Sequence, residues 1–199
     1  MQRSCLVGIS IAALLLSCGV QTASARPVHA PSRHEAKAGA PERRAREAKG
    51  PYYVDFRART AASWGHAFVW YGKTSERAVD VAGLTPAGDT LAYMIGYFTF
   101  VPSETGASYG DLDPDYLTAS YRVYLNEADA KRVFAYIKKL QADSPVWNAE
   151  TANCTSFIGS IAEFMGLKTP VRWTRPEDYV NQLRDMNGGR QIVRLAAEQ

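Results

Sequence analysis

One cysteine and one histidine in this chain have the types and surroundings that nucleophilic chemistry needs. Cys154 lies in the stretch Asn153-Cys154-Thr155-Ser156-Phe157, at the start of a segment with helical spacing of apolar residues. In the first turn of a helix, unpaired amides and the helix dipole favour negative charge, which predicts a readily ionised thiol. His66 is the only histidine beyond His34, and imidazole titrates in the range that a base for a thiol needs. The alternatives are a buried inert cysteine and a hydrogen-bonded core histidine.

The segment that carries the cysteine predicts a helix over residues 151–165. Its apolar side chains recur along one stripe, and Cys154 lies on that stripe, so we expect its side chain to face the core. Gly166 is expected to end this helix as a left-handed cap. The apolar positions are Phe157, Ile158, Ile161, Phe164 and Met165.

A strand over residues 63–71 is predicted to carry the histidine. Its side chains alternate, which places His66, Phe68 and Trp70 on the same face. Residues 72–75 predict a turn, and residues 77–82 predict a partner strand that completes a hairpin.

This hairpin places one carboxylate near the histidine. If Tyr71 pairs with Ser75, then Asp80 lies opposite His66 on the same face, where it could fix the tautomer and orientation of the ring. A register slip of one residue would turn Asp80 to the other face, and an ordinary carboxylate near a turn is the alternative.

The remaining pattern predicts one α+β domain, an antiparallel sheet packed against helices, because strands come first and helices later. Loops are expected at residues 83–90 and 103–114, and Pro102 is expected to end a strand. Asn126 predicts a helix N-cap, followed by a helix that ends before Pro145. The other predicted elements are strands at Tyr52–Arg59, 93–101, Leu117–Leu125 and 192–195, and a helix at Pro176–Met186.

The first 25 residues have the pattern of an export signal. Arg3 precedes an apolar run from residue 6 to 16, which is too short to span a bilayer stably, and Ala23-Ser24-Ala25 is a small-residue cleavage site. Cleavage after Ala25 predicts a periplasmic or secreted protein. Alternatively, residues 15–18 resemble a bacterial lipoprotein box, in which Cys18 is lipidated and anchors the protein to the membrane.

Residues 26–50 predict a disordered basic tether. They hold seven basic and three acidic residues and no aromatic residue, so they cannot bury enough apolar surface to offset chain entropy. The tether is either a solvated spacer or a weak attachment to anionic polymer or lipid headgroups. The domain, residues 51–199, has 15 basic and 17 acidic residues, which argues against a nucleic-acid partner.

Cysteine usage fits an exported protein with one free thiol. Cys5 and Cys18 lie in the leader, so removal of the leader would leave Cys154 alone and without a disulfide partner. The histidine and cysteine residues have no zinc spacing, and no cofactor is expected.

The order of the two motifs resembles a known family. Ser63-Trp64-Gly65-His66-Ala67-Phe68-Val69 comes about ninety residues before the Asn-Cys helix start. This order is similar to the circularly permuted branch of the papain-like superfamily, which includes permuted NlpC-type proteins of bacteria and the lecithin:retinol acyltransferase group. The resemblance covers residues 52–165 and implies a permuted papain-like core.

The resemblance implies a thiol hydrolase, either a cysteine peptidase or amidase, or an acyltransferase. Cys154 would be the nucleophile, His66 the base and Asp80 the orienting group, although many relatives have histidine or glutamate at that third position. Export and a basic tether favour a cell-envelope amide such as a peptidoglycan peptide as substrate, with a lipid ester as the second choice. The residues expected to line the substrate cleft are Tyr53, Trp64, Trp70, Trp147 and Asn153, each of which has simple packing as its alternative.

Two motifs compete with this interpretation. Residues 106–110 match the G-x-S-x-G nucleophile elbow, but they lack a preceding strand, a following helix and a later histidine. Residues 111–115 imitate the start of a calcium loop, but Tyr116 and Arg122 replace the required glycine and glutamate. We therefore expect a loop over the cleft at the first motif and a turn or helix cap at the second.

Three functional hypotheses follow from the sequence. The first is an exported cysteine-dependent amide or ester hydrolase or acyltransferase. The second is a non-catalytic envelope-binding module on the same fold, and the third is a structural lipoprotein with an unreactive thiol. The reactivity of Cys154 and its dependence on His66 discriminate between them.

Overall fold

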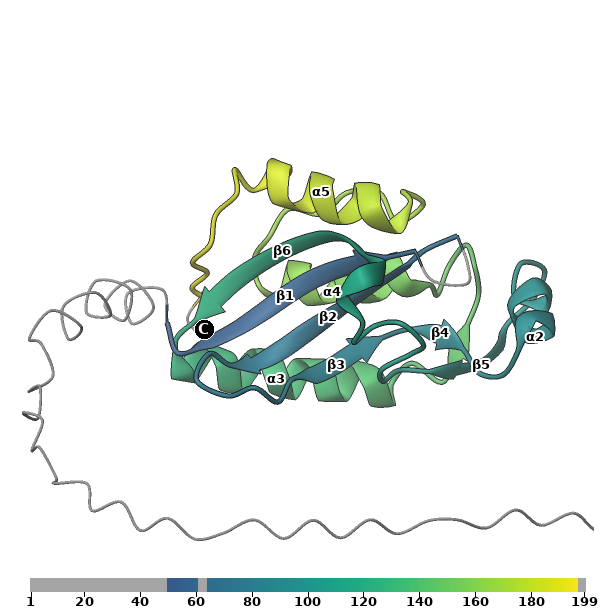
Figure 1. Ribbon diagram of the computed structural model, residues 1–199, viewed down its shortest axis with the longest axis horizontal. Coiled ribbons are helices and arrows are strands. Elements are labelled where there is room, and N and C mark those ends of the chain that lie inside the picture. The colour runs from purple at the N-terminus through teal and green to yellow at the C-terminus, as the bar shows by residue number, and fades with distance from the viewer. Residues whose placement is uncertain (1–49, 61–63, 197–199) are drawn as a thin grey trace, which may run out of the picture.

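A computed structural model describes residues 50–60 and 64–196 of the chain (Figure 1). The predicted export signal, Cys18 and residues 26–49 of the predicted tether lie outside the described residues. Gly50, the last residue assigned to the tether, belongs to the domain. It is buried with φ of 112°, and a Cβ there would lie 2.4 Å from the carbonyl oxygen of Leu125.

The architecture is α+β, with antiparallel sheets and four α-helices among the described residues. The strands are β1 (Tyr52–Arg59), β2 (His66–Lys73), β3 (Asp80–Gly83), β4 (Thr85–Pro86), β5 (Val101–Glu104), β6 (Leu117–Leu125) and β7 (Val146–Trp147). The helices are α2 (Thr90–Ile95), α3 (Glu127–Ala142), α4 (Cys154–Phe164) and α5 (Pro176–Met186), with a 3-10 turn at Pro114–Tyr116. None of the described helices has the length and apolar character needed to cross a membrane.

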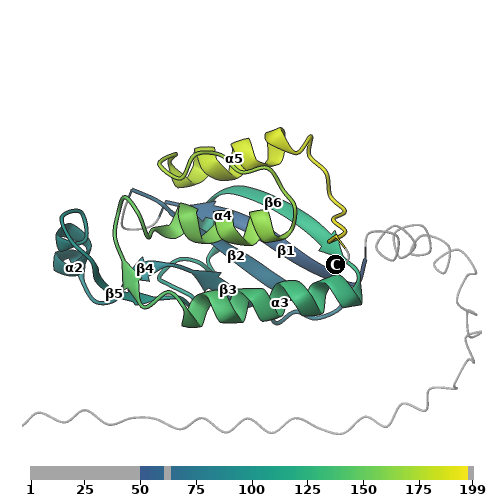
Figure 2. The same cartoon turned by 180° about the vertical axis from the view of Figure 1, so that it is seen from behind.

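The main sheet has the strand order β3-β2-β1-β6, and all its neighbouring strands are antiparallel. Alternate side chains of its long strands point to one face and are fully buried there, including Val54 and Phe56 of β1 and Val69 of β2. Helices α3, α4 and α5 cover that face (Figure 2). The sheet and the helices therefore enclose one core.

The helix starts follow from local sequence. Asn126 caps α3 by accepting a hydrogen bond from the Asp129 amide, as its residue type predicts. Val133 and Ile137 of α3 are buried, and α5 has the predicted bounds. Gly166 has φ of 73° and ends α4 in the predicted left-handed conformation.

The region around α2 differs from the prediction. A strand was expected at residues 93–101, but α2 occupies the first part of that segment and strand β5 begins only at Val101. Asp89 caps α2 by accepting from the Leu91 amide, and Pro102 lies inside β5, opposite Val146 of β7. A second small sheet with the order β4-β5-β7 results. At 192–195 there is only a single bridge, between Ile192 and Tyr124.

Candidate active site

Cys154 is held at the first turn of α4 by a complete capping box. The Asn153 side chain accepts from the Ser156 amide, and the Ser156 hydroxyl accepts from the Asn153 amide. Asn153 also donates to the carbonyl of Ala149. Asn153, predicted to line a cleft, is thus buried and fixes the start of the helix instead.

The sulfur of Cys154 sits beside the strand that carries His66. The backbone amides of Ala67, Thr155 and Cys154 itself lie near the sulfur and act to lower the pKa of the thiol. Ala67 directly follows His66 in β2, so α4 and β2 bring the thiol to the histidine end of that strand.

The Cys154 thiol is half-buried, because it lines a cavity. Burial raises the pKa of this thiol above its ordinary value, while the three amides and the Arg59 guanidinium act in the opposite direction without prevailing. The expectation of a readily ionised thiol at this helix start is therefore wrong for the free protein. A helix N-terminus favours the thiolate, but loss of water around the sulfur costs more.

His66 is buried at the start of β2 and is neutral at physiological pH. Burial lowers the pKa of His66 to about 4, while the Asp111 carboxylate raises it and Arg59 lowers it. The ring stacks on Phe68 at a centroid distance of 5.6 Å. No hydrogen bond joins His66 and Cys154, both of which the structure describes, and catalytic hydrogen bonds commonly tighten only when substrate binds.

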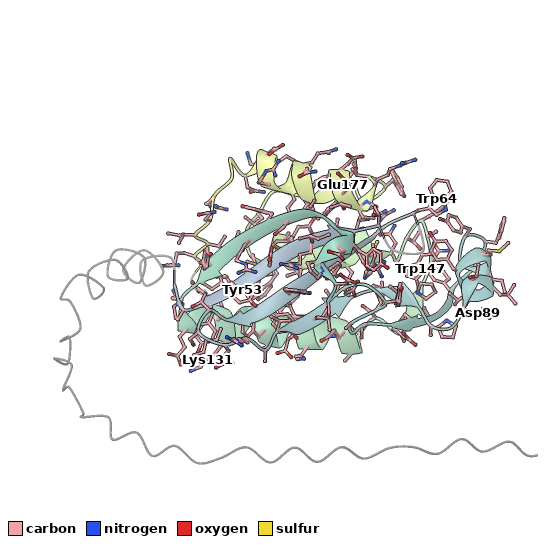
Figure 3. The ribbon with its side chains drawn as sticks, in the orientation of Figure 1. Tyr53, Trp64, Asp89, Lys131, Trp147 and Glu177 are labelled. Carbon is pink, nitrogen blue, oxygen red and sulfur yellow. The ribbon has the colours of Figure 1, made fainter. Side chains whose placement is uncertain are left out.

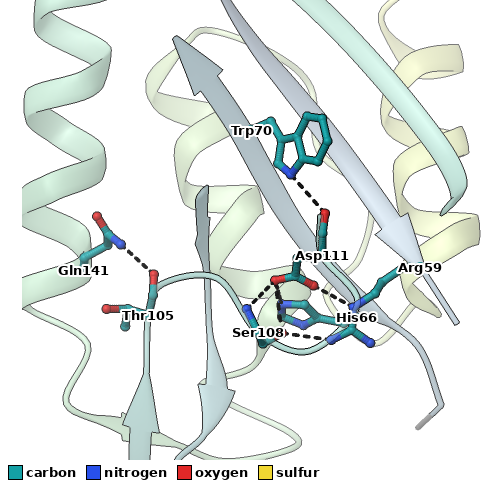
Figure 4. Close-up of polar contacts among 7 residues, drawn as sticks. All are labelled: Arg59, His66, Trp70, Thr105, Ser108, Asp111 and Gln141. Atoms are coloured by element: carbon teal, nitrogen blue, oxygen red, sulfur yellow. Dashed lines mark hydrogen bonds and ion pairs between the residues drawn. The ribbon is translucent and has the colours of Figure 1, made fainter. Parts of the chain in front are cut away.

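Asp111 is the carboxylate that faces His66 (Figure 4). Its Oδ2 lies 3.9 Å from His66 Nε2, a buried nitrogen with no hydrogen-bond partner in the described part of the chain. Arg59 Nε donates to Asp111 Oδ1 at 2.6 Å, and Arg59 lies opposite His66 in the pairing of β1 with β2. The amide and hydroxyl of Ser108 donate to Asp111 Oδ2, and Trp70 Nε1 donates to the Asp111 carbonyl.

Asp80 does not reach the histidine, because the predicted register of the hairpin is wrong. Tyr71 pairs with Asp80 rather than with Ser75, so Asp80 lies near the far end of β2 and is exposed. The turn and the irregular residues before β3 take up the additional length, which the sequence pattern does not reveal. The third polar group of the site was therefore assigned to the wrong aspartate.

A cavity of about 930 Å³ opens beside the two residues, and both His66 and Cys154 line it. Trp64 and Trp147, two of the residues expected in the cleft, also line it. The other lining residues come mainly from 84–94 and from the loop that follows β5, and they include Leu84, Thr85, Pro86, Asp89, Thr90, Tyr93, Met94, Glu104, Ala107, Ser108 and Tyr109.

Two aromatic residues expected in the cleft lie elsewhere. Tyr53 is buried at the other end of β1, with the guanidinium of Arg122 4.2 Å from its ring centroid. The guanidinium carbon of Arg57 lies 3.4 Å from the centroid of the Trp70 ring. The indole N–H of Trp70 donates to the carbonyl of Asp111. Neither ring lines the cavity: Tyr53 packs on the sheet beside Arg122, and Trp70 holds the backbone of Asp111.

The competing motifs have structural roles. Ser108, at the centre of the G-x-S-x-G match, lies in a loop that lines the cavity, as predicted, and its hydroxyl accepts from Arg59 and donates to Asp111. Asp113 caps the 3-10 turn by accepting from the Asp115 amide, which confirms the predicted helix cap. Within residues 50–60 and 64–196, no three His, Cys, Asp or Glu side chains are grouped so that they could hold a metal ion.

Sequence reasoning missed Arg59 and Asp111 as members of this site. Their partners are distant in the sequence, and the Asp-rich run at 111–115 indicated only a turn. The arrangement joins a thiol and a neutral imidazole that line an open cavity with a buried carboxylate near the imidazole. These are the parts that acyl transfer through a thioester requires.

Comparison of the chain with protein-family models, with curated proteins and with solved structures found no match.

Proposed function

We propose that this chain is a cysteine-dependent amide or ester hydrolase or acyltransferase. The observation that carries the proposal is that the side chains of Cys154 and His66 line one cavity, with the helix that begins at Cys154 packed against the strand that begins at His66. Asp111, rather than Asp80, is the carboxylate that would orient the imidazole: its Oδ2 lies 3.9 Å from Nε2, so the two groups must approach further before a hydrogen bond forms. This leaves Nδ1 as the nitrogen that exchanges a proton with the sulfur.

The reaction begins from a neutral pair. Burial favours the uncharged forms of both His66 and Cys154, so the thiol proton moves to His66 as the sulfur attacks the carbonyl carbon of the substrate. The oxyanion that forms accepts a hydrogen bond from the amide at the start of α4. Collapse of this intermediate expels the amine or alcohol, which takes the proton from His66, and a thioester remains on Cys154.

The second half of the reaction regenerates the thiol. His66 removes a proton from water or from another acceptor, which attacks the thioester carbonyl, and the sulfur leaves and is reprotonated. Water as acceptor gives a hydrolase, and an alcohol or amine gives an acyltransferase.

The proposed fold is a permuted papain-like core. In its favour, the strand with His66 precedes the helix with Cys154, and this helix packs by its first turn against that strand. We propose an exported protein whose substrate is a cell-envelope amide or ester, because the leader and the basic segment at 26–50 have export and anionic-surface patterns.

An activated ester tests the chemistry without knowledge of the natural substrate. With 4-nitrophenyl acetate, we expect a burst of nitrophenolate equal to the protein concentration and an acetyl group on the peptide that contains Cys154, located by mass spectrometry. Cys154→Ala should abolish both signals. His66→Gln should slow acylation by roughly 10²- to 10⁴-fold, the usual contribution of a general base.

The same experiment separates the enzyme from a binding module. If the rate of acetylation of Cys154 does not differ between the wild type and His66→Gln, the imidazole has no part in the chemistry and the proposal fails. A thiol that reacts only after unfolding would instead favour a structural protein.

A further inference from the structure

The end of the molecule that holds the cavity also exposes several large apolar side chains. We call this set the apolar rim; it consists of Leu91, Met94, Ile95, Phe98 and Phe100 around α2, and Trp64 on the other side of the cavity. Phe98 is 92% exposed and Trp64 is 72% exposed. Trp64 and Met94 line the cavity as well, so the rim and the mouth are one surface. Figure 3 shows Trp64, Trp147 and Asp89 at this end.

The apolar rim is held in place and is not a loosely packed loop. The side chain of Asn148 donates to the carbonyls of Gly96 and Thr99, and the Ala149 amide donates to Gly96 as well. Tyr93 stacks on the buried Trp147 at 5.3 Å. These contacts anchor the inner side of the α2 region, while no residue of α2 itself is buried.

The chemistry of the rim fits a lipid surface. No residue from 90 to 103 carries a charge, and the segment contains no Asn, Gln or His that could bind sugar hydroxyls. The hydroxyls of Tyr93 and Tyr97 are 3.0 Å apart and bond to each other. Leu, Met, Ile and Phe side chains partition into the acyl region of a bilayer, whereas a glycan platform needs polar groups beside its aromatic rings.

Two arginines contact exposed tryptophans, one of which, Trp64, belongs to the apolar rim. The guanidinium of Arg175 is 5.8 Å from the ring centroid of Trp64, and that of Arg172 is 5.1 Å from the ring of the exposed Trp173. Tryptophan is enriched at membrane–water interfaces, and arginine is attracted to anionic headgroups. Cationic groups thus lie beside exposed tryptophans at this end of the molecule, while the exposed acids Asp89 and Glu104 flank the uncharged segment.

We infer that the apolar rim docks the protein on an anionic lipid bilayer, with the mouth of the cavity facing the membrane surface. This docking depends on the folded domain and not on the chemistry of Cys154. Experiments can therefore refute membrane docking without refuting the proposed function, and the reverse.

Vesicle sedimentation of the purified chain tests the inference, with phosphatidylcholine vesicles with and without phosphatidylglycerol. Phe98→Asp should lower the partition coefficient for both vesicle types at least about tenfold, because burial of one Phe contributes roughly 1.5–3 kcal/mol. Arg175→Glu should weaken binding to the phosphatidylglycerol vesicles about fivefold or more and leave binding to pure phosphatidylcholine nearly unchanged. Cys154→Ala should bind as the wild type does.

Met186→Asp is the matched control. Met186 is an exposed apolar residue at the C-terminal end of α5, whereas Arg175 lies at the N-terminal end of that helix. The inference is overturned if no vesicle binds the chain, or if Met186→Asp lowers binding as much as Phe98→Asp does. Two other results, obtained without vesicle binding, also overturn it. If Phe98→Asp converts a dimer to a monomer in light scattering, the occupant of the rim is a second copy of the chain. If Phe98→Asp releases the chain from insoluble glycan, the occupant is a glycan.

Discussion

Two opposite charges meet in the interior beside His66. The side chains of Arg59 and Asp111 are almost fully buried, and their 2.6 Å contact compensates much of the cost of removing both from water. Asp111 thereby keeps a fixed place, with its second oxygen directed at Ser108 and His66. A fixed carboxylate is what an imidazole needs if one of its tautomers is to dominate.

We predict that Asp111→Asn impairs the site while Asp80→Asn does not. Loss of the carboxylate leaves Arg59 buried without its counter-charge, so stability should fall by roughly 3 kcal/mol. The pKa of His66, followed by NMR, should fall further because Asp111 raises it. Acetylation of Cys154 should slow in the same variant.

Asp80 provides the control for this variant, because it is an exposed aspartate on the strand next to His66. Equal effects of the two substitutions on the pKa of His66 would show that Asp111 has no specific influence on the ring.

At the scale of elements, three segments converge on the histidine. Strand β2 carries it, the first turn of α4 brings the sulfur to the next residue, and β3 ends with Gly83 against its ring. A Cβ at Gly83 would lie 2.7 Å from His66 Nε2 and 3.1 Å from Phe68 Cβ. The absence of a side chain at the end of β3 is therefore what makes room for the imidazole.

Gly83→Ala should consequently displace the ring of His66. We expect a loss of stability of about 1–3 kcal/mol from overpacking and a slower acetylation of Cys154 in the protein that remains folded. Thermal unfolding and the ester assay measure the two effects.

Gly106→Ala is the matched change, because a Cβ there would meet nothing within 4 Å. This variant should retain both stability and rate. If Gly83→Ala retained them too, the His66 ring would not be confined by β3.

At the scale of the whole molecule, burial decides the charge state of the site. His66 is buried at the start of β2, and Cys154 is partly buried at the start of α4, where both line the cavity. The free protein therefore holds a neutral imidazole and a thiol, and charge is created only during the reaction.

The neutral histidine makes stability depend on pH. Because the pKa of His66 is about 4 in the fold and 6.5 ordinarily, the unfolded chain takes up the proton first as pH falls. The stability that is present above about pH 6.5 should decline as the pH falls toward 4 and then level off, by about 3 kcal/mol in total.

Urea unfolding of the wild type and of His66→Gln between pH 7 and 4 isolates this contribution. The difference between their unfolding free energies should shift with pH, while the carboxylates shared by both proteins cancel. A constant difference would mean that His66 is not held neutral by burial.

The sequence by itself determined much of the local structure: strands β1 and β6, helix α5, the caps Asn126 and Gly166, and the choice of one cysteine and one histidine as the residues of interest. These follow from alternation, from side chains that reach their own backbone, and from residue chemistry, all of which act over a few positions. The α2 helix was mistaken for a strand because a short apolar run fits both periods.

Only the tertiary structure decided which aspartate meets His66 and whether Cys154 ionises readily. The register of β2 with β3 depends on how the intervening turn packs, and in the observed register Asp80 lies opposite Tyr71, far from His66. The carboxylate near His66 is instead Asp111, from a loop distant in the sequence. The pKa of a thiol depends on the water around it, and that water is removed by residues far along the chain. Burial and long-range pairing are properties of the assembled fold, which a local pattern does not contain.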